Sequence, residues 1–233
     1  MTGAAGADAG SVYGGWVTTE PSLDLPQPQQ ARSRRTLQRI LDAGTALLEE
    51  GGTDALTIAA VASRAGVSVG SVYRRFGGKD RLVAALQHAM IDQFRADILR
   101  RFAPLRTDPA ALIASAVAGL TETFEAHTRL MRVFIAAATS DPGVARVGSE
   151  ASIDASKVFR RFLEPVVPMI VAPDPERRLD VAFRLVYAAC MNRVLHGEHF
   201  ESERPLTWRQ LTDELVDAVC LYLLGTSPQC VRR

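Results

Sequence analysis

The chain of 233 residues has little cysteine and no long apolar run. Its three cysteines, Cys190, Cys220 and Cys230, form no C-x-x-C pair, and an odd, scattered set does not fit a secreted disulfide framework. No apolar run approaches the roughly 20 residues that a membrane-spanning helix needs. The N-terminus also lacks the basic and apolar regions of a signal peptide. These absences predict a reducing, cytoplasmic setting.

The sequence also lacks the motifs of common catalytic and metal sites. It contains no HExxH motif, no phosphate-binding glycine loop and no Ser-His-Asp order. His196 and His199 stand close to Glu198 and Glu201, but they follow a glycine in a polar segment that has no cysteine. We interpret them as loop residues rather than zinc ligands. We therefore expect no enzyme activity, no metal and no cofactor.

What the chain does contain is a large apolar fraction and an uneven distribution of charge. Hydrophobic residues make up 47% of it, which is enough for a substantial core in one large or two modest domains. Residues 31–81 carry nine Arg and Lys against five Asp and Glu, whereas residues 1–30 carry three acids and no base. A basic module on a neutral body is typical of a protein with a phosphate-binding surface.

Two short helices joined by a tight turn are predicted between Thr57 and Lys79. Thr57 is a suitable N-cap for the segment IAAVASRA, and Gly66 permits the left-handed backbone that a reversal of the chain needs. Ser68 then caps the segment VGSVYRRF, which ends at Gly77-Gly78. Helix, glycine turn and helix together make a helix-turn-helix. The positions that we expect to be buried in it are Val61, Ala62, Ala65, Val67 and Val72.

The outward face of the second short helix carries small groups, hydroxyls and cations. Such side chains suit entry into the major groove of DNA, where they can bond base edges and phosphates. The positions on this face are Val69, Gly70, Ser71, Tyr73, Arg74 and Arg75.

The segment SVYRRFGGKDRL resembles the signature of the tetracycline-repressor (TetR) family. In that family an aromatic residue, a basic or aromatic pair, Phe, a short Gly-containing turn and Lys recur in this order. The similarity runs from about Arg34 to Leu86, and the rest of the chain matches only in length and helical layout. It implies that Tyr73 and Lys79 contact phosphates and that the leading end of the helix reads bases. The DNA-binding residues expected are Thr57, Ser68, Val69, Gly70, Ser71, Tyr73, Arg74, Arg75 and Lys79.

Hydrophobic periodicity and breaker residues predict seven further helices and no convincing strand. The apolar run 166–171 is the one strand candidate, and its proline argues against it. The expected helices are Ser33–Glu50, Lys79–Arg101, Pro109–His127, Arg129–Thr139, Val144–Glu164, Pro175–His196 and Thr207–Leu224.

The predicted fold is therefore all-α, with an N-terminal three-helix helix-turn-helix domain and a larger C-terminal helical bundle. We expect a disordered N-terminal extension at 1–30, the DNA-binding domain at 31–79, a ligand-binding and dimerisation domain at 80–225 and a C-terminal tail at 226–233. The extension is rich in Gly, Ala, Pro and Gln and shows no period.

The resemblance also implies a ligand pocket among the helices of the bundle. Many aromatic residues and few fixed charges favour an apolar or aromatic ligand, although for each wall residue plain core packing is the other interpretation. The candidate walls are Phe94, Ile98, Leu120, Phe124, His127, Met131, Phe134, Phe159, Phe162, Phe183 and Tyr187.

The last two predicted helices are apolar on more than one side, so each needs burial all round. A second subunit would cover the outer side in a two-fold four-helix interface, as the resemblance implies. The alternative is that both helices lie deep in the core of a monomer. The candidate interface residues are Leu179, Val186, Cys190, Leu211, Leu215, Val219 and Tyr222.

Together these features predict a dimeric transcriptional regulator that binds a palindromic double-stranded DNA operator, most simply a repressor released by a small apolar or aromatic effector. A dimeric regulator without a ligand is the alternative within DNA binding. A helical enzyme or ligand carrier with a vestigial DNA module is the alternative from another class, and the cations on the second short helix argue against it.

Overall fold

The computed structural model describes residues 31–102, 108–200 and 202–225, and within these ranges it contains helices and no β-strand. The predicted all-α class is confirmed. The predictions for residues 1–30 and 226–233 lie outside the described residues. The elements are α1 (Ala31–Ala55), α2 (Ile58–Ala65), α3 (Val69–Phe76), α4 (Lys79–Arg101), α5 (Pro109–Ala138), α6 (Pro142–Phe162), the 3-10 helix η1 (Glu164–Met169), α7 (Pro175–His196) and α8 (Trp208–Leu224).

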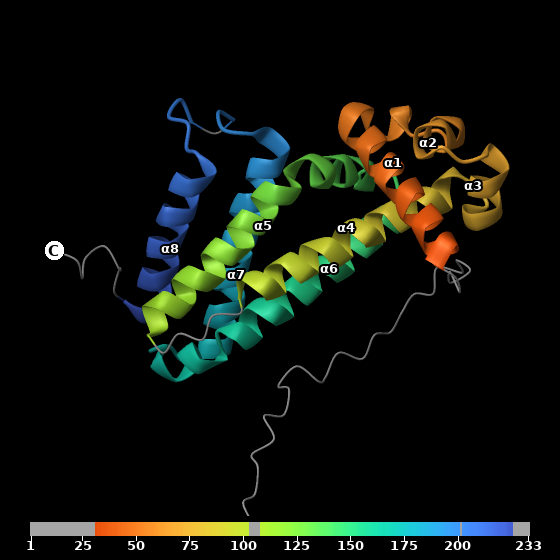
Figure 1. The fold of residues 1–233 in the computed structure, drawn as a ribbon. Coiled ribbons are helices and arrows are strands. Elements are labelled where there is room, and N and C mark those ends of the chain that lie inside the picture. The colour runs from red at the N-terminus through yellow and green to blue at the C-terminus, as the bar shows by residue number, and fades with distance from the viewer. Residues whose placement is uncertain (1–30, 103–107, 201, 226–233) are drawn as a thin grey trace, which may run out of the picture.

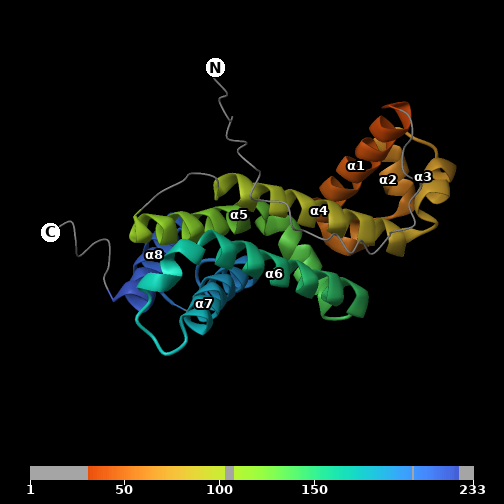
Figure 2. The same ribbon diagram turned by 90° about the horizontal axis from the view of Figure 1, so that it is seen from below.

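The helices form a small head and a longer body. We call α1, α2, α3 and the first turns of α4 the head, and the rest of α4 with α5 to α8 the body. Figure 1 shows the head at one end of the molecule and α8 at the other, with α4 running from the head into the body. In the turned view of Figure 2, α4 and α5 still lie along the length of the body. α4 is thus the element that joins the two parts.

Most helices begin and end where the sequence predicts. The carboxylates of Asp108, Asp141 and Asp174 and the hydroxyl of Thr207 accept hydrogen bonds from first-turn amides of α5, α6, α7 and α8. At the end of α1, Gly52 has a φ of 65°, so the regular helix breaks at the expected glycine pair.

The predicted break between two helices near His127 is wrong. α5 continues without interruption to Ala138, and the Thr128 hydroxyl donates to the carbonyl of Phe124 inside it. No Gly or Pro stands between Ala126 and Leu130, so nothing in the local sequence stops the helix. For the run 166–171 the sequence predicts no strand, and this is confirmed: the run contributes to the short 3-10 helix η1.

The molecule has two apolar cores, and the head core does not consist of head residues alone. Leu130 and Phe134 of α5 and Val144 of α6 pack in the same cluster as Leu48 of α1 and Phe76 of α3. The second cluster fills the body between α4, α5, α6, α7 and α8. The head is therefore seated on the middle of α5 and the start of α6, which gives the body a direct contact with it.

Candidate DNA-binding surface and ligand cavity

The α2–α3 unit is held in shape by caps at each end of its two helices. Thr57 Oγ1 accepts from the amide of Ala60 at 3.1 Å, and Ser68 Oγ accepts from the amide of Ser71 at 3.2 Å. Gly66 ends α2 in the left-handed region with a φ of 61°. A side chain there is strained, so the reversal between the helices depends on glycine.

The inner side of α3 is anchored by two side chains with no solvent exposure, Val72 and Phe76. They pack in the head core with Val61 and Ala62 of α2 and with Leu82 of α4. Burying both residues fixes the rotation of α3 about its axis, and that rotation decides which residues face outward.

The outer side of α3 presents Val69, Gly70, Tyr73 and Arg74 to solvent. Tyr73 is 52% exposed, so its ring and hydroxyl are accessible on this face. An apolar group, a bare backbone, a phenol and a guanidinium on one short helix can contact thymine methyls, base edges and phosphates.

The other residues predicted to bind DNA are already hydrogen-bonded within the head. Arg75 Nη2 donates to Ser33 Oγ of α1 at 2.8 Å, and Lys79 Nζ donates to the carbonyl oxygen of Thr53 at 2.8 Å. Ser68 Oγ and Ser71 Oγ lie 2.8 Å apart, and Thr57 caps α2. Lys79 has two further N–H donors and is exposed. Arg75 is partly buried, and its hydrogen bond to Ser33 connects α3 to α1.

Sequence reasoning missed the cations that tie α1 to the helix-turn-helix. Arg39 Nη2 donates to the carbonyl oxygens of Ala65 and Gly66, where α2 ends and the helix dipole favours a cation. Arg64 and Glu50 form a two-fold hydrogen-bonded ion pair at 2.5 Å between α2 and α1. These partners stand 14 to 27 positions apart, so no local pattern reveals them.

The body contains a cavity of about 430 Å³ between α4, α5, α6 and α7. Five of the predicted wall residues line it, namely Phe94, Ile98, Met131, Phe134 and Tyr187. The other six do not: Leu120, Phe124, His127, Phe159, Phe162 and Phe183.

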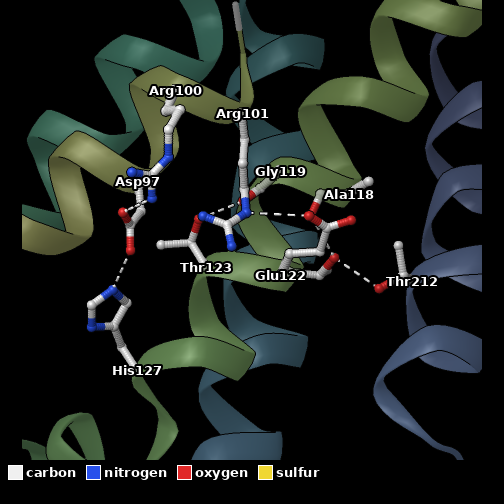
Figure 3. Close-up of polar contacts among 10 residues, drawn as sticks. Asp97, Arg100, Arg101, Ala118, Gly119, Glu122, Thr123, His127 and Thr212 are labelled. Carbon is white, nitrogen blue, oxygen red and sulfur yellow. Dashed lines mark hydrogen bonds and ion pairs between the residues drawn. The ribbon is translucent and has the colours of Figure 1, made fainter.

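These six residues are used for packing and for one polar contact. Phe124 is fully buried, and Phe94 and Tyr187 meet its ring edge-on at centroid distances of 5.3 Å each. His127 Nε2 lies 2.8 Å from Asp97 Oδ2 on α4, and Arg100 contacts the same carboxylate (Figure 3). Burial acts to raise the pKa of Asp97, but hydrogen bonds from His127 and Gln93 and the charge of Arg100 outweigh it and hold the pKa below its usual value.

The polar groups of the cavity lie mainly on α4 and α6, and the sequence did not single them out. The Gln87 amide nitrogen donates to the Val144 carbonyl oxygen at 2.9 Å, and Arg95 pairs with Asp154 at 3.6 Å. Burial raises the pKa of Tyr187, and a hydrogen bond from Ser152 only partly opposes this. Its phenol is therefore neutral at physiological pH, and the walls are mostly apolar.

The predicted dimer residues are divided between the core and the surface. Leu179, Val186, Cys190 and Val219 are buried in the body core, where burial raises the pKa of the Cys190 thiol to about 12. Leu211, Leu215 and Tyr222 are half-buried. A different apolar set is exposed on the two helices, namely Leu185, Ala188 and Leu195 of α7 and Ala218 and Leu221 of α8, and the half-buried Val181 of α7 lies one turn before Leu185.

The segment around His196 is occupied by other contacts. His196 stacks on Phe200 at a centroid distance of 3.9 Å, and Glu198 pairs with Arg193 at 2.8 Å. Glu201 lies outside the described residues. Within the described ranges no group of three or more His, Cys, Asp or Glu side chains could hold a metal ion, and no helix is long and apolar enough to cross a membrane.

Comparison of the sequence with known protein families gives a match over a segment that includes α3. Residues 40–86 match the family described as bacterial regulatory proteins, tetR family. The HTH-type transcriptional regulator BetI of Burkholderia cenocepacia is 32% identical over 113 residues, which are 48% of this chain and 57% of that protein. BetI of Paraburkholderia xenovorans is 31% identical over 99 residues, 42% of this chain and 50% of that one. The chain thus spans little more than half the length of these curated relatives.

Solved structures of other proteins share the fold over most of the chain. A transcriptional regulator from Rhodococcus sp. Rha1 has a TM-score of 0.61 at 19% identity and covers 81% of this chain and 96% of its own. A TetR transcription regulator from Haloarcula marismortui has a TM-score of 0.64 at 16% identity, covering 84% and 99%. These likenesses establish the arrangement of an N-terminal helix-turn-helix domain and a C-terminal helical domain.

Proposed function

We propose that this chain, whose residues 40–86 match the tetR family of bacterial regulatory proteins, is a homodimeric transcription regulator of that family, a repressor that a small apolar effector releases from a palindromic operator. The observation that carries the proposal is the outer face of α3, where Val69, Gly70, Tyr73 and Arg74 are exposed while Val72 and Phe76 fix the helix from behind.

The DNA contact can be tested by selection from a random duplex pool followed by titration of variants. Two-fold symmetry places the two α3 helices in grooves about one helical turn, roughly 34–36 Å, apart, so the selected sites should be inverted repeats. Arg74→Ala should weaken operator binding at least tenfold, whereas Arg160→Ala, an equal charge change at the far end of α6, should leave it unchanged. Equal behaviour of the two variants would contradict the proposal.

A variant of Lys79 provides a second, independent test of the same DNA-binding surface. Lys79→Ala should weaken binding to all duplexes about equally and reduce the salt slope by about one, as the loss of one phosphate contact does. Arg75→Ala should act differently, because Arg75 holds Ser33 of α1. We expect it to lower the stability of the head as well as its affinity for DNA.

For the dimer we propose the outward face of α7 and α8 rather than their buried residues. Val181, Leu185, Ala188 and Leu195 follow a spacing of four, three and seven residues along α7, and Leu185 and Leu221 are each 51% exposed. Apolar groups at such spacing favour a helical partner. Leu185→Glu should give a monomer in sedimentation, while Ile153→Glu, on α6 and 52% exposed, should stay dimeric.

The cavity supports the effector part of the proposal. α4 lines it from Gln87 to Ile98 and carries Lys79 at its head end, so a ligand that shifts α4 moves the head. Coupling of about 1–3 kcal/mol would weaken DNA binding roughly 5- to 150-fold, and operator DNA must weaken ligand binding by the same factor. Compounds found by thermal shift are to be titrated with and without operator; equal affinity in both would leave the body as a dimerisation platform.

The proposed role as a transcription regulator also implies a cellular location and a class of activity. A protein that acts on a bacterial operator works in the cytoplasm, where we place it. We propose regulation rather than catalysis, because the matched family consists of regulatory proteins.

A further inference from the structure

The cavity contains one buried amide with an unused hydrogen-bond acceptor. Gln87 of α4 is 2% exposed and lines the cavity. Its Nε2 donates to the Val144 carbonyl oxygen at 2.9 Å, and this bond fixes which end of the amide is nitrogen, because an oxygen there would face another oxygen. Within the part of the chain that the structure describes, no residue donates to Gln87 Oε1.

The position of Gln87 within the cavity gives the ligand an orientation. α4 and α6 are bridged at two points, by Gln87 with Val144 and, eight residues further along α4, by Arg95 with Asp154. At 1.5 Å per residue the two bridges lie about 12 Å apart. The Arg95–Asp154 bridge is partly exposed, whereas the Gln87 bridge is buried. An elongated molecule that enters the cavity thus has its inner end at Gln87.

The charges around the cavity limit the ligand further. Asp154 is paired with Arg95 at 3.6 Å and with Lys157 at 3.0 Å, and these partly exposed side chains place the charged groups of the cavity at its outer end. The inner end has no ionised lining residue near Gln87, and a charged group placed there would be desolvated without a counter-ion. An uncharged group suits this end.

We infer that the effector is an elongated, mainly apolar molecule whose inner end carries one uncharged hydrogen-bond donor, a hydroxyl or an amide N–H, which Gln87 Oε1 accepts at the inner end of the cavity. This inference rests on the proposed function, since it names the chemical class of the same effector. A ligand that fills the inner end of the cavity excludes water from Gln87 Oε1, so a ligand that supplies the donor is favoured over an equally shaped one that does not.

Gln87 also links recognition to the head. Its partner Val144 belongs to the head core together with Phe134, and all three residues line the cavity. A ligand group that bonds Gln87 therefore touches the residue that holds α4 against the start of α6. Gln87 is in this sense a positioning residue as well as a specificity-determining one.

The test compares hydroxyl compounds with their methyl ethers, which lack the donor and carry one further methyl group. The probes are 4-phenylphenol and 4-methoxybiphenyl, together with the flexible pair 1-octanol and methyl octyl ether, titrated by calorimetry against the full chain. We expect each hydroxyl compound to bind about three- to tenfold more tightly than its ether. In Gln87→Met, which keeps the length of the side chain, this preference should disappear. In Tyr187→Phe, which removes another hydroxyl of the same cavity, it should remain.

The outcomes separate this inference from the proposed function. Equal binding of alcohol and ether by the unaltered protein, or a preference that survives Gln87→Met, would overturn the role of Gln87 and leave the cavity as the effector site. Equal binding of alcohol and ether by the unaltered protein would overturn the inference even if Gln87→Met fails to fold. Binding of none of the four probes would overturn both the ligand class and the effector half of the proposed function. A clear alcohol preference without any loss of operator affinity would sustain the inference and sink the release mechanism.

Discussion

The head and the body are stabilised in different ways. In the head, short helices are set by caps and glycines close by in the sequence, such as Thr57, Gly66 and Ser68, and then locked by cations that reach across to α1. In the body, long helices are set by packing between distant segments, and Phe124 is held by rings from α4 and α7. Local signals therefore specify the head, while the body depends on which side chains meet in space.

The largest expected effect is that of Phe134→Ala, which tests whether the two regions are independent. Phe134 lies on α5 but packs in the head core and is 3% exposed. Its truncation should lower the free energy of unfolding by about 3–5 kcal/mol. The loss should appear in hydrogen exchange of α1 as well as α5. Protection of α1 equal to that of the unaltered chain would show that the head is stable without this contact.

Gly44→Ala should have the next largest effect, and it tests the close approach of α1 to α4 in the head. A Cβ at Gly44 would lie 2.8 Å from Cδ1 of Leu86, and Leu86 is fully buried, so it can shift only against its packed neighbours. Overpacking of α1 against α4 should cost about 1–3 kcal/mol in chemical unfolding, although alanine favours helix. The double variant Gly44→Ala, Leu86→Ala should lose less than the sum of the two single losses. Strict additivity would contradict the close approach.

Ser68→Ala should have a smaller and more local effect. Loss of the hydroxyl that accepts from the Ser71 amide should cost about 1 kcal/mol, the usual value of an N-cap. The exposed Ser63 inside α2 provides the control, since Ser63→Ala removes a hydroxyl without a capping role. Thermal unfolding of the two variants should differ, and DNA affinity should fall only for Ser68→Ala. Indistinguishable melting curves would mean that the cap is dispensable.

The smallest expected effect is on the pH dependence of stability in the body. The folded pKa of Asp97 is lowered, so its contribution is present above the unfolded pKa of about 3.9 and is lost as pH falls through the folded value. Asp97→Asn should therefore make the free energy of unfolding less dependent on pH below about 5. Asp92→Asn, an exposed position on the same helix, is the control. Parallel profiles for Asp97→Asn and the unaltered chain would show that the contact with His127 is unimportant.

The sequence by itself determined the elements and the surface of the head. Thr57, Gly66, Ser68 and the glycines after Phe76 act on backbone groups within four residues, so their effect is visible in any chain that carries them. The outward face of α3 follows from helical periodicity once Val72 is placed inside. The class of the body and most of its helix boundaries follow from the same rules, and the false break near His127 arose where no breaker residue stood.

Only the tertiary structure decided which apolar side chains of the body form walls, core or outer face. Phe94 and Phe124 look alike in the sequence, yet Phe94 lines the cavity and Phe124 lies behind it. Leu179 is buried and Leu185 is exposed, although both are leucines of one apolar helix. Gln87 showed no pattern at all, because its meaning comes from Val144, 57 residues away. Burial and hydrogen-bond partners are properties of the packed arrangement. When a helix is apolar on several sides, its sequence does not predict which side contacts which neighbour.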